Sequence, residues 1–181
     1  MVNASKSRPL DARNLFRAIH TGDFDRFKEL LDGGVHPNVI DNSNLGVGRD
    51  YAFGRTGLHW EVLYGNSRMV KYHLEMVMKE SLGKYKNDSG AAEKELAKFI
   101  NTKDSEGYRA IDIAIEMISF GEGGAETRKK TEREADYEYI AELLESCGAL
   151  RNPEKERERR GKKGGNHSNI QALLRGERGR G

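Results

Sequence analysis

The chain has 181 residues, of which 36% are hydrophobic and 33% are charged, and its formal net charge is only +2. This composition suits small stacked units with an economical core and argues against a thick central sheet. No apolar run reaches the roughly 18 residues of a membrane-spanning helix, residues 1–12 lack the apolar stretch of a secretory signal, and a single cysteine excludes an internal disulfide. We therefore expect a protein of the cytosol or the nucleus.

A first pair of helices is predicted within residues 13–41. Leu15, Ala18 and Ile19 lie at the i, i+3 and i+4 spacing of one helical face. A Thr-Gly-Asp break follows, in which Asp23 is placed to cap a second helix, and the Gly-Gly pair after that helix is typical of a helix end. The segment is therefore expected to fold as two short helices joined by a tight turn.

A second pair is predicted within residues 56–104. The sequence TGLH at residues 56–59 opens its first helix, and apolar residues at helical spacing mark the second. An insertion near the end of this unit carries a further helical pattern over residues 91–99, for which Asp88 or Ser89 is the expected cap. The second unit is thus longer than the first.

A third pair is predicted within residues 105–152, with an insertion between its two helices. A repeated helix pair buries its apolar face only against its neighbours, so the three units are expected to stack. The apolar positions recur at i, i+3, i+4 and i+7 in both helices, and they are Ile111, Ala114, Ile115 and Ile118 in the first and Tyr137, Ile140, Ala141 and Leu144 in the second.

The three units resemble the ankyrin repeat. The TGLH of the second unit is similar to the TPLH signature of that family, with Gly57 in place of Pro. The resemblance implies an all-α solenoid of helix-turn-helix repeats over residues 13–152 with projecting hairpin or loop insertions, between an N-terminal extension over residues 1–12 and a flexible basic tail over residues 153–181. It is most complete in the first unit, at Leu15, Ala18, Gly22, Leu30, Leu31, Gly34, Asn38 and Asp41.

The resemblance also implies a function, that of a non-enzymatic adaptor or scaffold that binds a protein partner through its concave finger and inner-helix surface. An insertion over residues 43–55 lies at the projecting finger and combines arginine with aromatic residues, which are types enriched at binding hot spots. Alternatively, Tyr51 and Phe53 fold back over the stack as a local plug. The candidate protein-binding residues are His20, Thr21, Asn42, Ser43, Arg49, Tyr51, Phe53, Arg55, Leu63, Tyr64, Ser105, Glu106, Tyr108, Glu116 and Met117.

The C-terminal tail is basic. From Arg151 onward, ten Lys and Arg residues against four Glu residues leave a charge of +6, which puts −4 on the rest of the chain. Basic, Gly-containing segments bind nucleic acid by charge attraction or act as nuclear localisation signals. In EKERER, however, Glu alternates with basic residues, and no aromatic residue offers a platform for base stacking. The alternatives are a nucleic-acid-associated or nuclear factor whose repeats recruit a protein, and a tail that only keeps the chain soluble.

Patterns typical of catalysis or cofactor binding are absent from the sequence. The five histidines lack the spacing of metal ligands, and the glycine-rich pieces lack the context of a phosphate loop. His59 is expected to organise the turn before a helix rather than to act in catalysis. Cys147 is expected to pack as a small buried hydrophobe rather than to serve as a reactive thiol. No metal, cofactor or membrane contact is predicted.

Glu61 and His73 depart from the repeat pattern. By register with Ala18 and Leu30 of the first unit, they occupy positions that are normally small or apolar, and buried. An unpaired carboxylate at such a position would be strongly destabilising. We therefore expect Glu61 to pair with His73 or with a group from the neighbouring insertion, and the alternative is that Glu61 points to water. No nucleophile or metal cluster accompanies the pair, so catalysis is not assigned to it.

Overall fold

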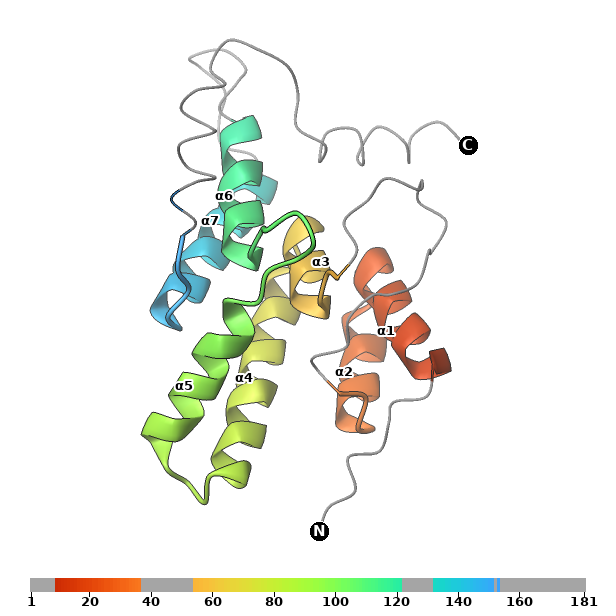
Figure 1. Cartoon of the computed structure of the whole chain (residues 1–181). Coiled ribbons are helices and arrows are strands. Elements are labelled where there is room, and N and C mark those ends of the chain that lie inside the picture. The colour runs from red at the N-terminus through yellow and green to blue at the C-terminus, as the bar shows by residue number, and fades with distance from the viewer. Residues whose placement is uncertain (1–8, 37–53, 122–131, 152, 154–181) are drawn as a thin grey trace.

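The computed structural model describes residues 9–36, 54–121, 132–151 and 153. Within these ranges the chain folds as seven α-helices (Figure 1), which confirms the predicted all-α class. The helices are α1 (Pro9–Thr21), α2 (Phe24–Asp32), α3 (Gly57–Leu63), α4 (Ser67–Lys84), α5 (Ser89–Ile100), α6 (Ala110–Gly121) and α7 (Glu132–Ser146).

Six of the helices form three successive pairs that pack side by side. Helix α1 contacts α2, α3 contacts α4, and α6 contacts α7. Between pairs, α3 contacts both α1 and α6, and α4 contacts both α2 and α7 (Figure 1). The molecule therefore has two rows of helices, an inner row of α1, α3 and α6 and an outer row of α2, α4 and α7.

The turns inside the first two pairs share a glycine with the same backbone conformation. Gly22 and Gly65 both have a φ of 70°, a left-handed conformation that favours glycine. In the first pair, Asp23 Oδ1 accepts a hydrogen bond from Arg26 N at 3.0 Å, as the sequence predicts. In the second pair, Asn66 Nδ2 donates to Ile19 O at 2.8 Å instead, so this turn is tied to the preceding pair.

Helix α5 is the element that the second unit adds. It runs back beside α4, which is its main contact (Figure 1). Its N-cap is Asp88, whose Oδ1 accepts from Ala91 N at 3.1 Å, so the predicted helix and one of its two predicted caps are confirmed. Leu96, Phe99 and Ile100 are buried against the core. Beside α4, the outer row therefore has a second helix, α5.

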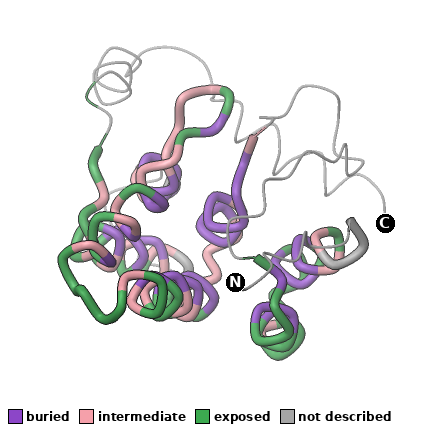
Figure 2. The backbone as a smooth tube through the Cα atoms, turned by 60° about the horizontal axis from the view of Figure 1, so that its bottom comes forward, coloured by how far each residue is buried: buried purple, intermediate pink, exposed green. Residues whose placement is uncertain are grey.

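The core consists of two apolar clusters. One joins α1 and α2 with Met69 of α4, and the larger one joins the remaining helices. Trp60 on α3 is partly buried and packs against both clusters. Figure 2 shows the buried residues gathered on the helix faces that meet inside the stack. None of the helices in the described ranges combines the length and the apolar character that a bilayer crossing requires.

Gly65→Ala is expected to lower the free energy of unfolding by about 1–2 kcal/mol, because an L side chain is strained at a left-handed φ. Its Cβ would also lie 3.4 Å from Tyr137 Cζ, in van der Waals contact with α7. Urea denaturation followed by circular dichroism measures the loss. Gly107→Ala is expected to lose a similar strain energy, because Gly107 has a φ of 81°, but nothing lies within 4 Å of its added Cβ, so the difference between the two variants isolates the contact with Tyr137. Equal stability of the Gly65 variant and the native chain would contradict this account.

Candidate functional site

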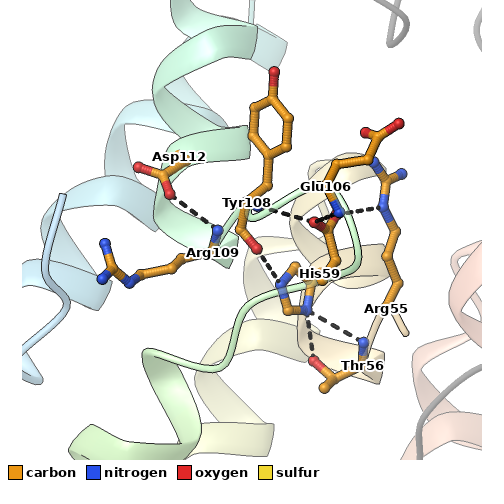
Figure 3. Close-up of polar contacts among 8 residues, drawn as sticks. Arg55, Thr56, His59, Glu106, Tyr108, Arg109 and Asp112 are labelled. Atoms are coloured by element: carbon orange, nitrogen blue, oxygen red, sulfur yellow. Dashed lines mark hydrogen bonds and ion pairs between the residues drawn. The ribbon is translucent and has the colours of Figure 1, made fainter. Parts of the chain in front are cut away.

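His59 organises the start of α3 and the loop before α6. Its Nδ1 accepts from the backbone N–H of Thr56 at 3.2 Å and lies 2.8 Å from Thr56 Oγ1. Since Nδ1 accepts, the ring proton sits on Nε2, which donates to Tyr108 O at 3.0 Å (Figure 3). Both Thr56 and His59 are buried. The predicted structural role of His59 is therefore confirmed.

Asp112 accepts a backbone hydrogen bond at the start of α6, as His59 does at the start of α3. Its Oδ2 accepts from Arg109 N at 2.9 Å, over the same spacing that joins His59 to Thr56 (Figure 3). A carboxylate thus replaces the imidazole as the helix cap in the third pair. What the two positions share is a hydrogen-bond acceptor for the first turn, and no proton-transfer chemistry is needed to explain either residue.

Burial lowers the pKa of His59 below its ordinary value of 6.5, because the protonated ring would lose its hydration. Above pH 6.5 the ring is neutral in both the folded and the unfolded chain, and its full stabilisation is present. As the pH falls below that value, only the unfolded chain gains the proton, so the free energy of unfolding falls by up to about 1.4 kcal/mol per pH unit. His59→Gln should show a shallower fall between pH 7 and pH 5 in urea denaturation.

The control for this prediction is His36→Gln, since His36 is exposed. Comparison of the two variants shows whether a change in slope is specific to the buried His59. Identical slopes for the native chain and the His59 variant would show that His59 does not contribute to the acid sensitivity.

A buried ion pair links the start of α3 to the same loop. Arg55 Nε donates to Asp104 Oδ2 at 3.2 Å, and the two side chains are 2% and 0% exposed. Asp104 Oδ1 also accepts from the backbone N–H groups of Glu106 at 3.0 Å and Tyr108 at 2.9 Å. The carboxylate therefore folds the loop around itself while neutralising the arginine.

Glu61 and His73 form the buried pair that the sequence predicts. Nδ1 of His73 lies 2.7 Å from Oε1 of Glu61, and both side chains are 0% exposed. The ring of His73 lies among apolar neighbours, with its centroid 5.0 Å from that of Phe99 and 6.2 Å from that of Phe27. The alternative in which Glu61 points to water is wrong. The second carboxylate oxygen and the Nε2 of the ring have no hydrogen-bond partner in the described part of the chain.

Three side chains, His20, Tyr64 and Trp60, form what we call the aromatic row across α1 and α3. Tyr64 OH lies 2.8 Å from His20 Nδ1. The ring of Tyr64 stacks on that of Trp60, with centroids 6.0 Å apart and an angle of 18° between planes. Beyond Trp60, the Cζ atom of Arg55 lies 5.4 Å from the centroid of its ring. The row therefore runs from the exposed His20 to the partly buried Trp60, and the buried Arg55 lies beyond it.

The structure divides the predicted protein-binding residues into groups. His20, Thr21 and Ser105 are exposed, and Tyr64, Glu106 and Tyr108 are partly buried. Five predicted residues lie outside the described ranges, and they are Asn42, Ser43, Arg49, Tyr51 and Phe53.

Four of the predicted binding residues are buried, which corrects the expectation that they face a partner; they are Arg55, Leu63, Glu116 and Met117. Arg55 is not an exposed residue of a projecting finger, because its side chain forms a buried ion pair with Asp104. Leu63 and Met117 belong to the larger apolar cluster. Cys147 is partly buried against that cluster, as expected of a small hydrophobe.

Sequence reasoning missed two residues of this region, Trp60 and Asp104. A signal existed for each. Trp60 is the only tryptophan of the chain and directly follows the TGLH segment at residues 56–59. Asp104 begins the segment DSEG, and Asp followed by Gly at this spacing is typical of a turn closed by the carboxylate.

No group of three or more His, Cys, Asp or Glu side chains gathers as a metal site within the described ranges. Compared with models of known protein families and with curated proteins, the chain matches none.

Proposed function

We propose that the chain is an ankyrin-type repeat protein of the cytosol or nucleus that works as a non-enzymatic protein-interaction module. The observation that carries this proposal is the packing of three helix pairs into an inner and an outer row. The shared φ of Gly22 and Gly65 and the shared capping by His59 and Asp112 support a repeated unit. Repeats of this kind present an extended concave surface to partners.

The proposed binding surface lies at the ends of the inner helices and on the loop before α6. It contains polar and aromatic side chains that the described structure leaves exposed or half-buried. Tyrosine in particular is enriched at hot spots, because it offers a large contact area and a polar tip. The residues of this inner-row surface are His20, Thr21, Tyr64, Ser105, Glu106 and Tyr108.

Affinity capture with two matched variants tests the proposal. Thr21→Arg combined with Ser105→Arg adds two positive charges to the inner-row surface at exposed positions. Glu75→Lys replaces a negative charge with a positive one, so it also changes the net charge by +2, at an exposed position of α4 in the outer row. The inner variant is expected to lose at least about 90% of a partner that the native chain retains, because new charges at an interface core are costly to bury.

The outer variant is expected to retain that partner. A partner lost only with the outer variant, or one kept equally by both, would contradict binding through the inner row. Circular dichroism of both variants is the control measurement that tests whether the fold is retained.

The second candidate function rests on the uneven charge of the chain, with +6 from Arg151 onward and −4 before it. In this alternative the tail binds nucleic acid and the repeats recruit a protein. Deleting residues 153–181 would then abolish salt-sensitive retention on RNA or DNA and leave protein capture intact. Retention that survives the deletion would exclude the tail as the nucleic-acid contact.

A further inference from the structure

Helix α7 presents an acidic face at the opposite end of the stack from α1 and α2 (Figure 1). Its 15 residues include six acids and one arginine, a net charge of −5, whereas no other described helix is more negative than −2. Tyr137, Ile140 and Leu144 are buried in the core. The opposite side of the helix, which carries Tyr139 and Glu142, is exposed.

The exposed apolar side chains lie at the same place. Among the described residues only two large hydrophobic side chains are exposed, Tyr139 at 44% and Leu150 at 61%. Leu143, one turn after Tyr139 on α7, is only partly buried. A single exposed apolar residue is ordinary on a protein surface. An acidic helix with exposed apolar groups on it and directly after it instead suits a segment that is both basic and apolar.

The chain that follows α7 begins by turning back onto it. Leu150 N donates to Asn101 Oδ1 at 2.7 Å, and Leu150 O accepts from Arg109 Nη1 at 3.0 Å, so this peptide is held on both sides. Arg151 then donates from Nε to Glu145 Oε1 at 2.6 Å, and its Nη2 lies 2.5 Å from the same oxygen. This ion pair places the start of the tail beside the acidic helix.

The tail contains one segment of complementary chemistry. Residues 159–181 hold seven Lys or Arg residues against one Glu, a charge of +6. The large apolar residues of the tail form a single cluster at the i, i+3 and i+4 spacing of one helical face, and they are Ile170, Leu173 and Leu174. Ser168 and Gln171 stand at the N-cap and N3 positions of the helix that this spacing predicts. Arg175 and Arg178 follow, so positive charge borders the apolar cluster.

We propose that residues 168–178 of this chain, which we call the tail segment, dock as a short helix on the exposed face of α7. The apolar cluster packs on Tyr139 and Leu143, and Arg175 and Arg178 approach the acidic side chains that border them. Both contributions are needed, because an isolated exposed ion pair adds very little. The docked tail segment makes α7 a competitor of any polyanion for the basic tail.

The length of the intervening sequence allows this contact. Sixteen residues separate Arg151 from Ser168, and a random coil of that length spans about 20–24 Å on average. From Ser146 back to Tyr139 the helix rises only about 10 Å. Such a tether gives the tail segment an effective concentration of the order of 1 mM. A Kd of about 0.1 mM for the same segment in free solution would therefore keep it docked about nine-tenths of the time.

A nitroxide spin label on the tail segment tests the docking in the full chain. Cys147→Ala removes the one native thiol, and Asn169→Cys carries the label. Relative to the reduced label, we expect broadening of the nitrogen-15 NMR amide resonances of Tyr139 and Glu142 on α7, and none at Lys28, which is exposed on α2. Full intensity at α7, or equal broadening on α2, would overturn the proposal.

Leu173→Ser combined with Leu174→Ser removes most of the apolar cluster without changing the charge. The docked fraction should fall at least about fivefold, because two leucine side chains lose their apolar burial. Asn166→Ser combined with His167→Ser is the matched control, since it changes two residues of the same tail outside the tail segment. Retained broadening in the leucine variant, or an equal loss in both variants, would overturn the apolar contact.

Chemical shifts give a second measurement that needs neither the label nor the replacement of Cys147. In the otherwise native chain, the leucine variant should move the amide resonances of Tyr139 and Glu142, and the control variant should leave them in place. Resonances that stay unmoved in the leucine variant would contradict docking on α7.

Glu142→Lys on α7 and Glu93→Lys on α5 make the same charge change at exposed positions. The first should lower the docked fraction at least about twofold and the second should leave it unchanged. Equal effects would remove the acidic face of α7 from the contact. Mixing spin-labelled chains with unlabelled nitrogen-15 chains distinguishes one molecule from two. Broadening of α7 in that mixture would assign the surface to the tail of a second copy and overturn docking within one chain.

Discussion

Replacing His73 with Leu alone is expected to lower the free energy of unfolding by about 3–5 kcal/mol, because Glu61 would be left buried without its partner. Glu61→Ala alone should also destabilise, since it leaves the ring of His73 unpaired among Phe27 and Phe99. The double variant, His73→Leu with Glu61→Ala, should regain most of the lost free energy of unfolding. It restores the residue types that Ala18 and Leu30 already supply at the same positions of the first pair.

Urea denaturation of the four proteins in this cycle measures the coupling between the two side chains. We expect a coupling energy of at least about 2 kcal/mol, because the two residues are in direct contact. The double variant can even exceed the native chain, since well-packed apolar residues often replace a buried pair without loss. Strictly additive losses would show that the pair is not an energetic unit.

Replacing Arg55 with Ala has the second large effect, again about 3–5 kcal/mol, because it leaves the Asp104 carboxylate buried without a cation. The loop before α6 should loosen with it, because Asp104 holds the backbone of Glu106 and Tyr108. Hydrogen exchange at these two amides measures the loosening, and urea denaturation measures the free energy. Arg55→Lys is expected to lose only about 1 kcal/mol, since the cation remains.

The comparison pair for this prediction is Arg26 and Glu29, whose side chains are 45% and 68% exposed. Arg26→Ala is expected to change stability very little, because solvent screens an exposed pair. Equal effects at Arg26 and Arg55 would mean that burial of the second pair adds nothing. The result also bears on function, because a charge reversal at Arg55 would disturb the fold rather than a surface.

Features set by local register were predictable from the sequence. The cap at Asp23, the extra helix and its cap at Asp88, and the pairing of Glu61 with His73 depend on spacing along one or two neighbouring helices. Helix periodicity and register determine such contacts directly. The all-α class is confirmed, and the ankyrin identity stays a prediction.

Features set by distant contacts were not predictable. Arg55 stands at the end of a glycine-rich insertion, so composition alone favours an exposed finger residue. Its burial depends on Asp104, which is 49 positions away along the chain. Met117 likewise becomes buried only when α6 packs against its neighbours. Residues whose environment comes from another part of the chain carry no local signal of it.

The position of Trp60 between the two apolar clusters has a consequence for cooperativity. In stacked folds, each unit is stabilised mainly by its interface with the next, so partial unfolding begins where an interface parts. Separation of α1 and α2 from the rest would expose the indole while most helices remain intact. Trp60 fluorescence therefore reports the separation of the two apolar clusters, and circular dichroism reports the unfolding of the helices. Coincidence of the two transitions would mean that the chain unfolds as one unit.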